Sequence, residues 1–305
     1  MSGRSPISVP GGAAAPQVSV VIPARDEAAA LPGVIAGVRE ALDRAGRTHE
    51  IVVVDDGSSD GTGDLARRAG ARVLRHPYSM GNGAAVKAGI RASAGSVVAL
   101  MDADGQHAPG DLLRLLDALG EEWAMVVGAR VSGHAGLHRA LANRIYSALA
   151  SHVSGVPIPD LTSGFRVVRR EAARKFLYML PNTFSYPSTL TLALLRSGRP
   201  VRFVPIEARP RTGTSKIRLL ADGSRFLLII LRVATAFAPL RVFLPASFGA
   251  FAAGAAVYAW WWVDGGHPRM TNGIQLLLLL GALLFFLGLL AEQVASLRFD
   301  RSEEE

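Results

Sequence analysis

Short apolar runs alternate with longer mixed segments along the first 130 residues of the chain. The runs are rich in valine and isoleucine and occupy 18–22, 51–54, 97–101 and 125–128, whereas the segments between them mix alanine and leucine with charged residues. Apolar runs of this length predict buried strands, and the mixed segments predict helices. Because strands that alternate with helices pair mostly in parallel, with helices on both faces, the pattern predicts an α/β domain.

Two much longer apolar runs lie near the carboxyl terminus. Val242–Val263 carries no charge, and Ile274–Ala291 has Gln275 as its one strongly polar residue. Each run matches the roughly 20 helical residues that cross a bilayer. Buried core helices are the alternative, but neither run has an amphipathic period. The runs therefore predict two membrane helices joined in a tight hairpin, in agreement with a chain that is 50% hydrophobic.

Arginines flank the two predicted spans unequally. Those outside the hairpin are Arg232, Arg241, Arg298 and Arg301, whereas the connecting loop has only Arg269. Because basic flanks favour the cytoplasmic side, we expect a two-span protein of the plasma (inner) membrane whose main domain is cytoplasmic. The first sixteen residues lack an apolar segment long enough for a signal peptide and are expected to form a flexible tail.

The formal net charge of +8 is concentrated next to the first span, where residues 209–241 include seven bases and one acid. Arg218, Arg225 and Arg232 are seven residues apart and would share one face of a helix. This predicts an interfacial helix against anionic lipid head groups; a solvated surface helix is the alternative. The segment lacks interleaved aromatic residues and nucleic-acid-binding motifs, so no nucleic acid is expected as a partner.

These patterns predict five parts of the chain. They are a flexible tail (1–16), a cytoplasmic α/β domain (17–211), a basic loop with the interfacial helix (212–241), a two-helix transmembrane hairpin (242–297) and a cytoplasmic tail (298–305). Prolines are frequent in the second half of the α/β domain, where we expect loops and helices that complete a cleft. The chain has no cysteine, which excludes disulfides and thiol chemistry.

Polar clusters follow three of the predicted strands directly: PARDE (23–27), DDGSSDGT (55–62) and DADGQH (102–107). Parallel sheets bind ligands beyond the carboxyl ends of their strands, so these clusters mark a candidate site. On an extended backbone, Asp102, Asp104 and Gln106 would share one face and converge on one ligand. Their oxygen atoms suit Mg2+ or Mn2+, which is usually completed by substrate phosphates. General acid and base catalysis by the two carboxylates is the alternative.

The second cluster adds a place for a nucleoside. Asp55 or Asp56, at the end of a strand, can accept hydrogen bonds from a ribose or a base, and residues 57–62 predict a turn that caps a helix. The glycine-rich segment 81–89 resembles a dinucleotide fingerprint only superficially, because it follows a loop. It is better interpreted as a turn that opens a helix near the nucleotide.

Together these motifs resemble glycosyltransferase family 2, most of all its dolichyl-phosphate mannose synthases and bacterial polyprenyl-phosphate glycosyltransferases. The motifs, in the family's order, are VSVVIPARDEAAAL, IVVVDDGSSDGT, GNGAAVKAGI, MDADGQH, GAR and DLTSGFRVVRR, within residues 18–241. The resemblance implies a GT-A-type, Rossmann-like domain. It also implies metal-dependent, inverting transfer of a sugar from GDP-mannose or a UDP-hexose to a dolichyl or undecaprenyl phosphate.

The resemblance further implies roles for individual residues. Pro23, Ala24, Arg25 and Glu27 would border the base, Asp56 would contact the nucleoside and Asp102 the ribose or phosphate, and Asp104 and Gln106, with Asp102 beside them, would hold Mg2+ or Mn2+. Arg130, Ser163, Arg166, Arg209, Arg211 and Lys216 would meet the acceptor phosphate. Asp104, Arg130, Arg166 and Lys216 would be the catalytic residues.

One segment departs from the family's pattern. Many relatives have an acid after a phenylalanine, where this chain has Ser185, Tyr186, Ser188 and Thr189 in FSYPSTLTLALL. An acceptor phosphate already carries negative charge and needs no strong general base, so the departure is compatible with a lipid phosphate acceptor.

Two alternatives remain open. A processive polysaccharide synthase of the same fold is disfavoured, because the chain lacks a QxxRW motif and further spans. A catalytically silent membrane scaffold is supported only by the missing carboxylate. Gly249 and Gly254 of the hairpin also raise the possibility of packing against a second copy, which would make a homo-oligomer.

Overall fold

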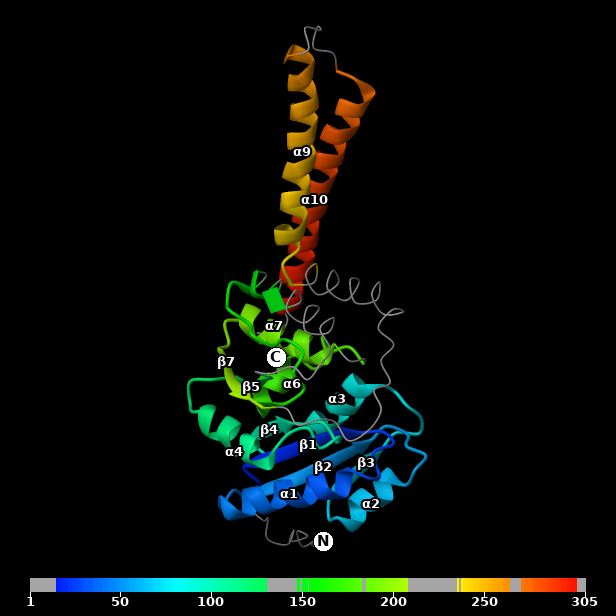
Figure 1. Ribbon diagram of the computed structural model, residues 1–305, viewed down its shortest axis with the longest axis vertical. Helices are drawn as coiled ribbons and strands as arrows, with labels where there is room; N and C mark the ends of the chain where they lie inside the picture. Colours follow the sequence, from blue (N-terminus) through cyan, green and yellow to red (C-terminus); the bar gives the residue numbers. More distant parts are fainter. Residues whose placement is uncertain are drawn as a thin grey trace, which may run out of the picture. The chain divides into compact units, whose positions relative to one another are not determined.

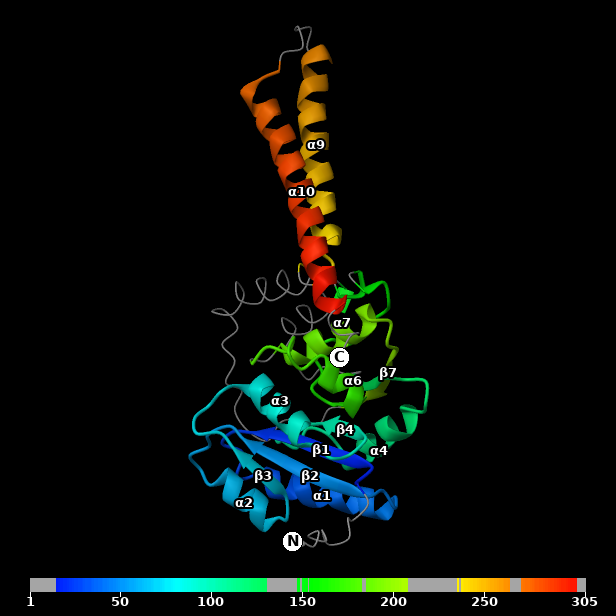
Figure 2. The same ribbon diagram turned by 180° about the vertical axis from the view of Figure 1, so that it is seen from behind.

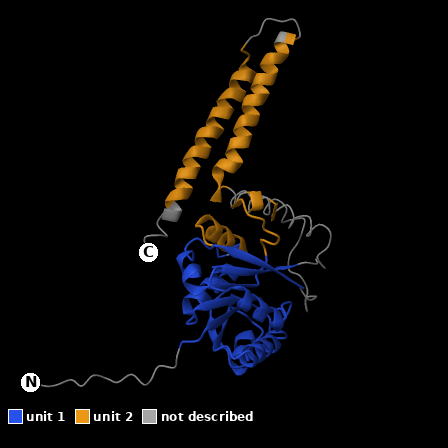
Figure 3. Cartoon of the chain, turned by 90° about the vertical axis from the view of Figure 1, so that its left-hand side faces the viewer, with its two compact units in different colours: residues 1–134, 163–186, 200–214 blue, residues 135–162, 187–199, 215–305 orange. Residues whose placement is uncertain are grey.

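The computed structural model describes most of the chain, namely residues 15–130, 147–148, 150–152, 154–182, 185–207, 235, 237–263 and 270–300. The chain forms two compact units, each assembled from segments that are distant in sequence (Figure 3). Unit 1 contains Met1–His134, Ser163–Tyr186 and Pro200–Thr214, and unit 2 contains Ala135–Thr162, Pro187–Arg199 and Ser215–Glu305. The five-part division predicted from the sequence stays a prediction.

Unit 1 is built on a seven-stranded sheet with the order β3-β2-β1-β4-β6-β5-β7 (Figures 1 and 2). The strands are β1 (Val18–Ala24), β2 (His49–Asp55), β3 (Arg72–Arg75), β4 (Val97–Leu100), β5 (Met125–Arg130), β6 (Arg166–Arg169) and β7 (Val201–Ile206). Strand β6 is antiparallel to β4 and β5, and the other neighbouring strands are parallel. The predicted mostly parallel sheet is confirmed.

Helices cover both faces of this sheet. On one face lie α1 (Leu31–Arg44), α2 (Thr62–Arg68) and α4 (Pro109–Ala118), and on the other lie α3 (Asn82–Ala92) and α6 (Arg170–Lys175). A loop and then a helix follow each of the first four strands: α1 follows β1, α2 follows β2, α3 follows β3 and α4 follows β4. The polar clusters of the sequence are therefore held between buried strands and helix starts.

Strand β1 shows how the sequence produces packing on two sides. All seven residues of β1 are buried, and successive side chains point to opposite faces. Val20 and Ile22 join a core that includes Ile35 of α1. Val21 faces α3 instead, where a β-carbon added to Gly89 would lie 2.2 Å from its Cγ1 atom. The absence of a side chain at Gly89 thus lets α3 pack closely on the central strand.

Unit 2 contains the long helices α9 (Pro239–Val263) and α10 (Asn272–Asp300). By length and composition, Pro239–Trp261 and Asn272–Leu297 are apolar enough to cross a membrane. Most of their large hydrophobic side chains are exposed, as expected of lipid-facing helices. The two predicted apolar helices are therefore confirmed as candidate spans, while residues 212–234 of the predicted interfacial helix lie outside the described residues.

Small residues line the contact between α9 and α10. A β-carbon added to Gly281 would lie 3.0 Å from the ring of Phe251, and one added to Gly254 would touch Leu278. Ser247 Oγ also donates a hydrogen bond to the carbonyl oxygen of Gly281 at 2.8 Å. Gly254 thus faces the partner helix within the hairpin. Contact with a second copy of the chain stays a prediction.

A carboxylate in the second candidate span joins the hairpin to another helix of unit 2. Glu292 accepts a hydrogen bond from Arg196 Nη2 at 2.7 Å and another from the backbone nitrogen of Leu240 at 3.3 Å. Arg196 is the last residue of α7 (Tyr186–Arg196). Because an unpaired carboxylate in an apolar helix is costly, this pairing stabilises the attachment of α7 to α9 and α10.

Candidate active site

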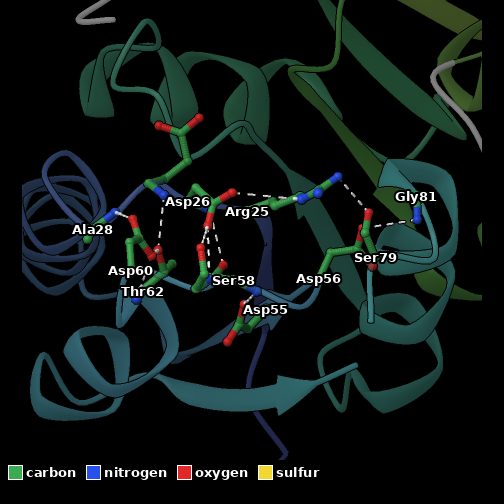
Figure 4. A network of polar contacts seen from close by, with 12 residues as sticks. Arg25, Asp26, Ala28, Asp55, Asp56, Ser58, Asp60, Thr62, Ser79 and Gly81 are labelled. Atoms are coloured by element: carbon green, nitrogen blue, oxygen red, sulfur yellow. Dashed lines mark hydrogen bonds and ion pairs between the residues drawn. The ribbon is translucent and has the colours of Figure 1, made fainter. Parts of the chain in front are cut away.

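Loops at the carboxyl edge of β1 and β2 bind each other through side chains (Figure 4). Asp26, after β1, adopts a φ of +53°, a left-handed conformation that aspartate tolerates better than most residues. Its backbone nitrogen donates to Ser58 Oγ at 3.0 Å, and its Oδ1 atom accepts from the backbone nitrogen of Ser59 at 3.0 Å. The PARDE and DDGSSDGT motifs therefore fold as one assembly.

Asp60 completes this assembly. Its Oδ2 atom accepts from the backbone nitrogen of Ala28 at 3.0 Å, and its Oδ1 atom accepts from the backbone nitrogen and the hydroxyl of Thr62. Burial would raise the pKa of Asp60, but the hydrogen bonds from Thr62 and Ala28 outweigh it and lower the pKa. The ionised carboxylate thus holds the start of α2 to the loop after β1, as the predicted turn requires.

The adjacent acids Asp55 and Asp56 have different surroundings. Asp55 Oδ1 accepts from the backbone nitrogen of Ser58 at 2.9 Å, and its Oδ2 lies so near Gly63 that a β-carbon there would be 2.5 Å away. Asp55 therefore builds the turn into α2. Asp56 contacts the loop after β3 instead.

Asp56 organises residues 76–81, which we call the tyrosine loop. Its Oδ1 atom lies 2.7 Å from His76 Nδ1 and accepts from the backbone nitrogen of Met80 at 2.8 Å. Its Oδ2 atom accepts from Ser79 Oγ at 2.8 Å and from the backbone nitrogen of Gly81 at 3.0 Å. An ionised carboxylate has about four acceptor positions, so these contacts occupy all of them. Burial would raise the pKa of Asp56, but the hydrogen bonds from His76, Met80, Ser79 and Gly81 together lower it.

The other predicted base-bordering residues lie along the same edge. Pro23 and Ala24 are buried in β1, paired with Val54 and Asp55 of β2. Arg25 is more than half exposed and donates from Nη1 to Ser79 Oγ at 2.9 Å. The backbone nitrogen of Glu27 donates to Thr62 Oγ1 at 3.0 Å.

The MDADGQH segment is a turn, so the extended backbone predicted for residues 102–106 is wrong. Strand β4 ends at Leu100, and Gly105 has a φ of +75°, which favours glycine. Asp104 Oδ1 accepts from the backbone nitrogen of Gln106 at 3.1 Å, a local bond typical of aspartate in turns. The same bond explains why the chain leaves the strand: the aspartate offers the backbone a partner outside the sheet.

Asp102 lies against the SGFR segment and His107. A β-carbon added to Gly164 would lie 2.9 Å from Asp102 Oδ2, so this glycine allows the two loops to approach closely. His107 Nε2 is 3.7 Å from Asp102 Oδ2. The ring of His107 stacks on Phe165, with centroids 4.5 Å apart. Two motifs about sixty residues apart in the sequence therefore form one site.

Arg166 is the most buried charged side chain of this region, with no exposed surface. Its Nη2 atom donates to the carbonyl oxygen of Ser163, and its Nη1 atom lies 4.0 Å from the sulfur of Met125. Burial raises the pKa of the nearby Tyr186 hydroxyl; the charge of Asp102 adds to this rise and that of Arg166 opposes it. The charges of Asp102 and Arg166 thus both act on the Tyr186 hydroxyl, in opposite directions.

Four predicted site residues remain, Arg130, Arg209, Arg211 and Lys216. Arg130 is the exposed last residue of β5. Arg209, Arg211 and Lys216, predicted to form a basic loop, lie outside the described residues.

The turn after β4 carries oxygen donors of the kinds that hard divalent cations prefer. Asp102 and Asp104 provide carboxylate oxygens and Gln106 an amide oxygen, the ligand types preferred by Mg2+ and Mn2+. Among the described residues, no group of three or more His, Cys, Asp or Glu side chains is arranged for a metal. A cation here would depend on one or two carboxylates and on phosphate oxygens of the substrate, which is the usual arrangement for Mg2+.

Family models match both halves of this architecture. The model of glycosyl transferase family 2 matches residues 19–177, which include β1 to β6 and the turn after β4. The chain belongs to glycosyl transferase family 2. A second model, the GtrB C-terminal hairpin, matches residues 238–297, which include most of α9 and α10.

Curated relatives of this family 2 glycosyltransferase include enzymes whose names refer to polyprenol or undecaprenyl phosphate. Polyprenol monophosphomannose synthase of Mycolicibacterium smegmatis is 33% identical over 215 residues, covering 65% of this chain and 80% of the relative. Undecaprenyl-phosphate 4-deoxy-4-formamido-L-arabinose transferase of Aeromonas hydrophila is 30% identical over 185 residues, covering 55% of this chain and 56% of the relative.

Solved structures agree in fold. Glucosyl-3-phosphoglycerate synthase of Mycobacterium tuberculosis, in complex with phosphoglyceric acid, superposes with a TM-score of 0.60 at 22% identity, covering 72% of this chain and 80% of that one. At this identity the likeness concerns the fold alone. It confirms the GT-A-type domain expected for a family 2 glycosyltransferase.

Sequence reasoning missed two sets of contacts made by the predicted site residues. The contacts of Asp56 with the tyrosine loop were not expected, although the segment HPYSMGN combines a proline, an aromatic residue and a glycine. The stacking of His107 on Phe165 was also missed, because nothing in the sequence pairs the two motifs. Both features depend on which loops the sheet brings together.

Asp56→Asn should lower the free energy of unfolding by about 2–4 kcal/mol at pH 7. An amide cannot accept four hydrogen bonds, and its NH2 group would face the N–H and O–H donors of the tyrosine loop. Thermal denaturation in detergent measures this. The folded pKa of Asp56 is lowered, so its stabilisation is full above the ordinary carboxyl pKa of about 3.9 and is lost as the pH falls through the folded value.

The difference in the free energy of unfolding between wild type and Asp56→Asn should therefore shrink below about pH 4. Asp64→Asn, which removes an exposed ion pair with Arg67, should cost less than about 1 kcal/mol and serves as the control. If Asp56→Asn lowered the free energy of unfolding equally at pH 7 and pH 3, the result would contradict this account.

Proposed function

We propose that this protein transfers a sugar from a nucleotide diphosphate sugar, GDP-mannose or a UDP-hexose, to a polyprenyl phosphate, with inversion at the anomeric carbon. The observation that carries the proposal is the union of a family 2 glycosyltransferase domain with a GtrB-type apolar hairpin in one chain. A polyprenyl acceptor is held in the membrane, so a hairpin of this kind keeps the enzyme beside it. The names of the relatives support the same class of acceptor.

At the donor end, the chain binds the nucleotide along the carboxyl edge of the sheet. Pro23, Ala24, Arg25 and Glu27 border the base, and Asp56 and Asp102 lie along the nucleoside and its phosphate. Asp104 and Gln106, with Asp102 beside them, would hold Mg2+ or Mn2+, which would supply positive charge against the departing diphosphate. The buried position of Asp104 strengthens such charge interactions, because water screens them less.

The transfer step needs no strong general base. An oxygen of the acceptor phosphate forms the new bond to the anomeric carbon as the bond from that carbon to the diphosphate oxygen breaks. The bonding electrons leave with the nucleoside diphosphate, and no proton has to be removed from the ionised acceptor. The absence of a carboxylate among Ser185, Tyr186, Ser188 and Thr189 is compatible with this step.

Basic residues orient the two phosphates and offset their charge. We assign this role to Arg130, to Arg166 beside Ser163, and to Arg209, Arg211 and Lys216. Fixed positive charge at a site of developing negative charge is a major contribution to catalysis. The arginines that flank the hairpin support a catalytic domain on the cytoplasmic side of the plasma membrane, near anionic lipid.

The test is transfer by the full chain in detergent or vesicles. Labelled GDP-mannose and UDP-hexoses are each incubated with undecaprenyl phosphate and Mn2+, Mg2+ or EDTA. We expect one donor to yield a lipid-linked monosaccharide, with little product in EDTA. Polymeric product would favour a processive synthase, and an inert protein across the whole panel would favour a scaffold; either result would overturn the proposal.

A further inference from the structure

The helices on the two faces of the sheet in unit 1 differ in charge (Figure 1). On one face, α1, α2 and α4 together contain five basic and five acidic residues, so their formal charges cancel. On the other face, α3 and α6 together contain five basic residues and Glu171 as the one acid. The five bases, which we call the α3–α6 basic surface, are Lys87, Arg91, Arg170, Arg174 and Lys175.

Ion pairs follow the same division. Three of the five arginines on the balanced face are paired with acids of their own helices: Arg44 with Glu40, Arg67 with Asp64, and Arg114 with Asp111. Within the described part of the chain, no base of the α3–α6 basic surface forms an ion pair, although Glu171 is close in sequence to Arg174 and Lys175. The positive charge of this surface is therefore not neutralised by the described residues around it.

The helix dipole explains where some of these bases lie, but not the scarcity of acids beside them. Cations are favoured in the last turn of a helix, where Arg91 of α3 and Arg174 of α6 lie. Arg67 has the same position in α2 and is nevertheless paired with Asp64. A structural role for a basic residue thus allows an acidic neighbour, and the charge of α3 and α6 needs a second explanation.

The two bases of α3 repel each other. Lys87 and Arg91 are four residues apart and lie on the same side of the helix. Burial lowers the pKa of Lys87, and the positive charge of Arg91 lowers it further. Like charges at this spacing destabilise a helix. Anions bound beside Lys87 and Arg91 would offset their repulsion.

The α3–α6 basic surface is continuous, and an exposed aromatic ring lies next to it. Arg170 Nη1 donates to the carbonyl oxygen of Ser93, directly after α3, at 3.0 Å. Lys87 Nζ donates to the carbonyl oxygen of Leu180, after α6, at 3.0 Å. Tyr178, which also follows α6, is 57% exposed. Tyrosine is enriched where proteins meet the lipid interface, because its ring is apolar and its hydroxyl is polar.

An anionic lipid surface fits these features. The same chain carries two candidate membrane spans and matches the GtrB C-terminal hairpin, so unit 1 is covalently tied to a segment that is suited to a bilayer. Such a tether raises the effective concentration of the α3–α6 basic surface at the lipid, and contacts that are individually weak are then sufficient. Anionic head groups attract nearby lysines and arginines, and tyrosine suits their depth.

We propose that unit 1 docks on the anionic leaflet of the membrane through the α3–α6 basic surface, with Tyr178 at the lipid interface. This inference rests on the proposed function only in that the hairpin enters a membrane. The surface is distinct from the interfacial helix predicted within residues 212–241. Docking of this kind holds the glycosyltransferase domain in one orientation to the lipid whether or not substrates are bound.

The experiment uses the absence of cysteine from the chain. One cysteine is introduced by Ala88→Cys on α3 or by Ala36→Cys on α1, on the opposite face, and is labelled with a fluorophore. The full chain is reconstituted in vesicles of phosphatidylcholine, alone or with an equal part of phosphatidylglycerol, that contain a lipid with a quencher on its head group. The label on α3 should be quenched more than the label on α1, and only with phosphatidylglycerol. Salt at about 1 M, where the Debye length is about 3 Å, should abolish this difference.

Two double variants test the charges. Arg91→Gln with Arg174→Gln changes the α3–α6 basic surface, and Arg44→Gln with Arg67→Gln changes the opposite face by the same net charge. The first should lower the docking constant, taken from the quenched fraction of the α3 label, by about tenfold or more, because each base near an anionic leaflet contributes roughly fivefold. The second should leave the constant unchanged. Arg91→Lys with Arg174→Lys keeps the charges and should dock like wild type.

Several results would overturn the inference. Equal quenching of the two labels, or quenching that is independent of phosphatidylglycerol, would show that the α3–α6 basic surface does not select anionic lipid. Equal losses in the two glutamine double variants would assign docking to net charge alone. A surface that serves an acidic protein or a nucleic acid instead would leave both labels unquenched, which would also overturn the inference.

The docking measurement contains no substrate, so it is separate from the test of sugar transfer. If the protein docked through this surface but were inert with every donor, the proposed function would be refuted and the docking inference would stand. If lipid-linked sugar formed while the α3 label stayed unquenched, the docking inference alone would be refuted.

Discussion

Asp104→Asn should reduce sugar transfer by at least about a hundredfold, the usual cost of losing one group that stabilises developing charge. Asparagine preserves the size of the side chain, and its amide oxygen still accepts the hydrogen bond that Asp104 takes from the backbone of Gln106. The turn should therefore form, while the charge that attracts a cation is lost. Initial rates with the active donor measure the first effect, and Mn2+ titration followed by electron paramagnetic resonance measures the second.

The control for Asp104→Asn is Asp117→Asn. Asp117 lies on α4 and pairs with Arg47 on the surface at 2.9 Å, so its loss should leave both rate and Mn2+ affinity unchanged. Asp104→Asn with wild-type Mn2+ affinity but no transfer would assign Asp104 a role other than metal binding. Full activity of Asp104→Asn would show that Asp104 has no role in the active site.

Arg166→Met should lower the free energy of unfolding by about 3 kcal/mol and abolish most transfer. Methionine has a similar length, but it leaves the carbonyl oxygen of Ser163 without this donor and removes a fully buried positive charge. The Tyr186 hydroxyl then loses the positive charge that opposes the rise of its pKa, and the acceptor phosphate loses the cation that we propose for it. Thermal denaturation in detergent and the acceptor KM measure the two effects separately.

Arg169 provides a matched control for Arg166. It lies on the same strand and donates to the carbonyl oxygens of Trp123 and Gly120. Arg169→Met should therefore lower stability without changing the kinetics of the folded enzyme. Relative to Arg166→Met, Arg166→Lys should restore the positive charge but not the planar arrangement of guanidinium donors, giving intermediate activity. If Arg166→Met were destabilised yet kept the wild-type kcat and acceptor KM, its role would be structural alone.

Four strands of the sheet, β1, β2, β4 and β5, could be predicted from the sequence, whereas β3, β6 and β7 could not. β1, β2, β4 and β5 are apolar runs whose burial on both faces leaves a clear pattern. β3 and β6 are short, and each places two apolar residues between arginines, which a surface segment also does. The antiparallel insertion of β6 between β4 and β5 depends on partners that are distant in sequence.

The neighbourhood of the candidate site residues could be predicted in outline but not in geometry. The acids that follow β1, β2 and β4 were expected to share one edge of the sheet, because backbone topology alone brings those strand ends together. The extended backbone predicted for residues 102–106 was wrong, because the local hydrogen bond of Asp104 and the left-handed Gly105 produce a turn. Likewise, the sequence did not distinguish Asp55 from Asp56, whose partners come from different loops.

By itself, the sequence determined the α/β class, the two candidate membrane spans, the family and the edge of the sheet at which the predicted site residues gather. These follow from periodicity, segment length and motif order, which are local properties of the chain. Only the tertiary structure decided that Asp56 is occupied by the tyrosine loop, that Asp102 lies against Gly164, and that Arg166 is wholly buried. Such contacts join segments tens of residues apart, and their energies depend on packing that no local pattern encodes.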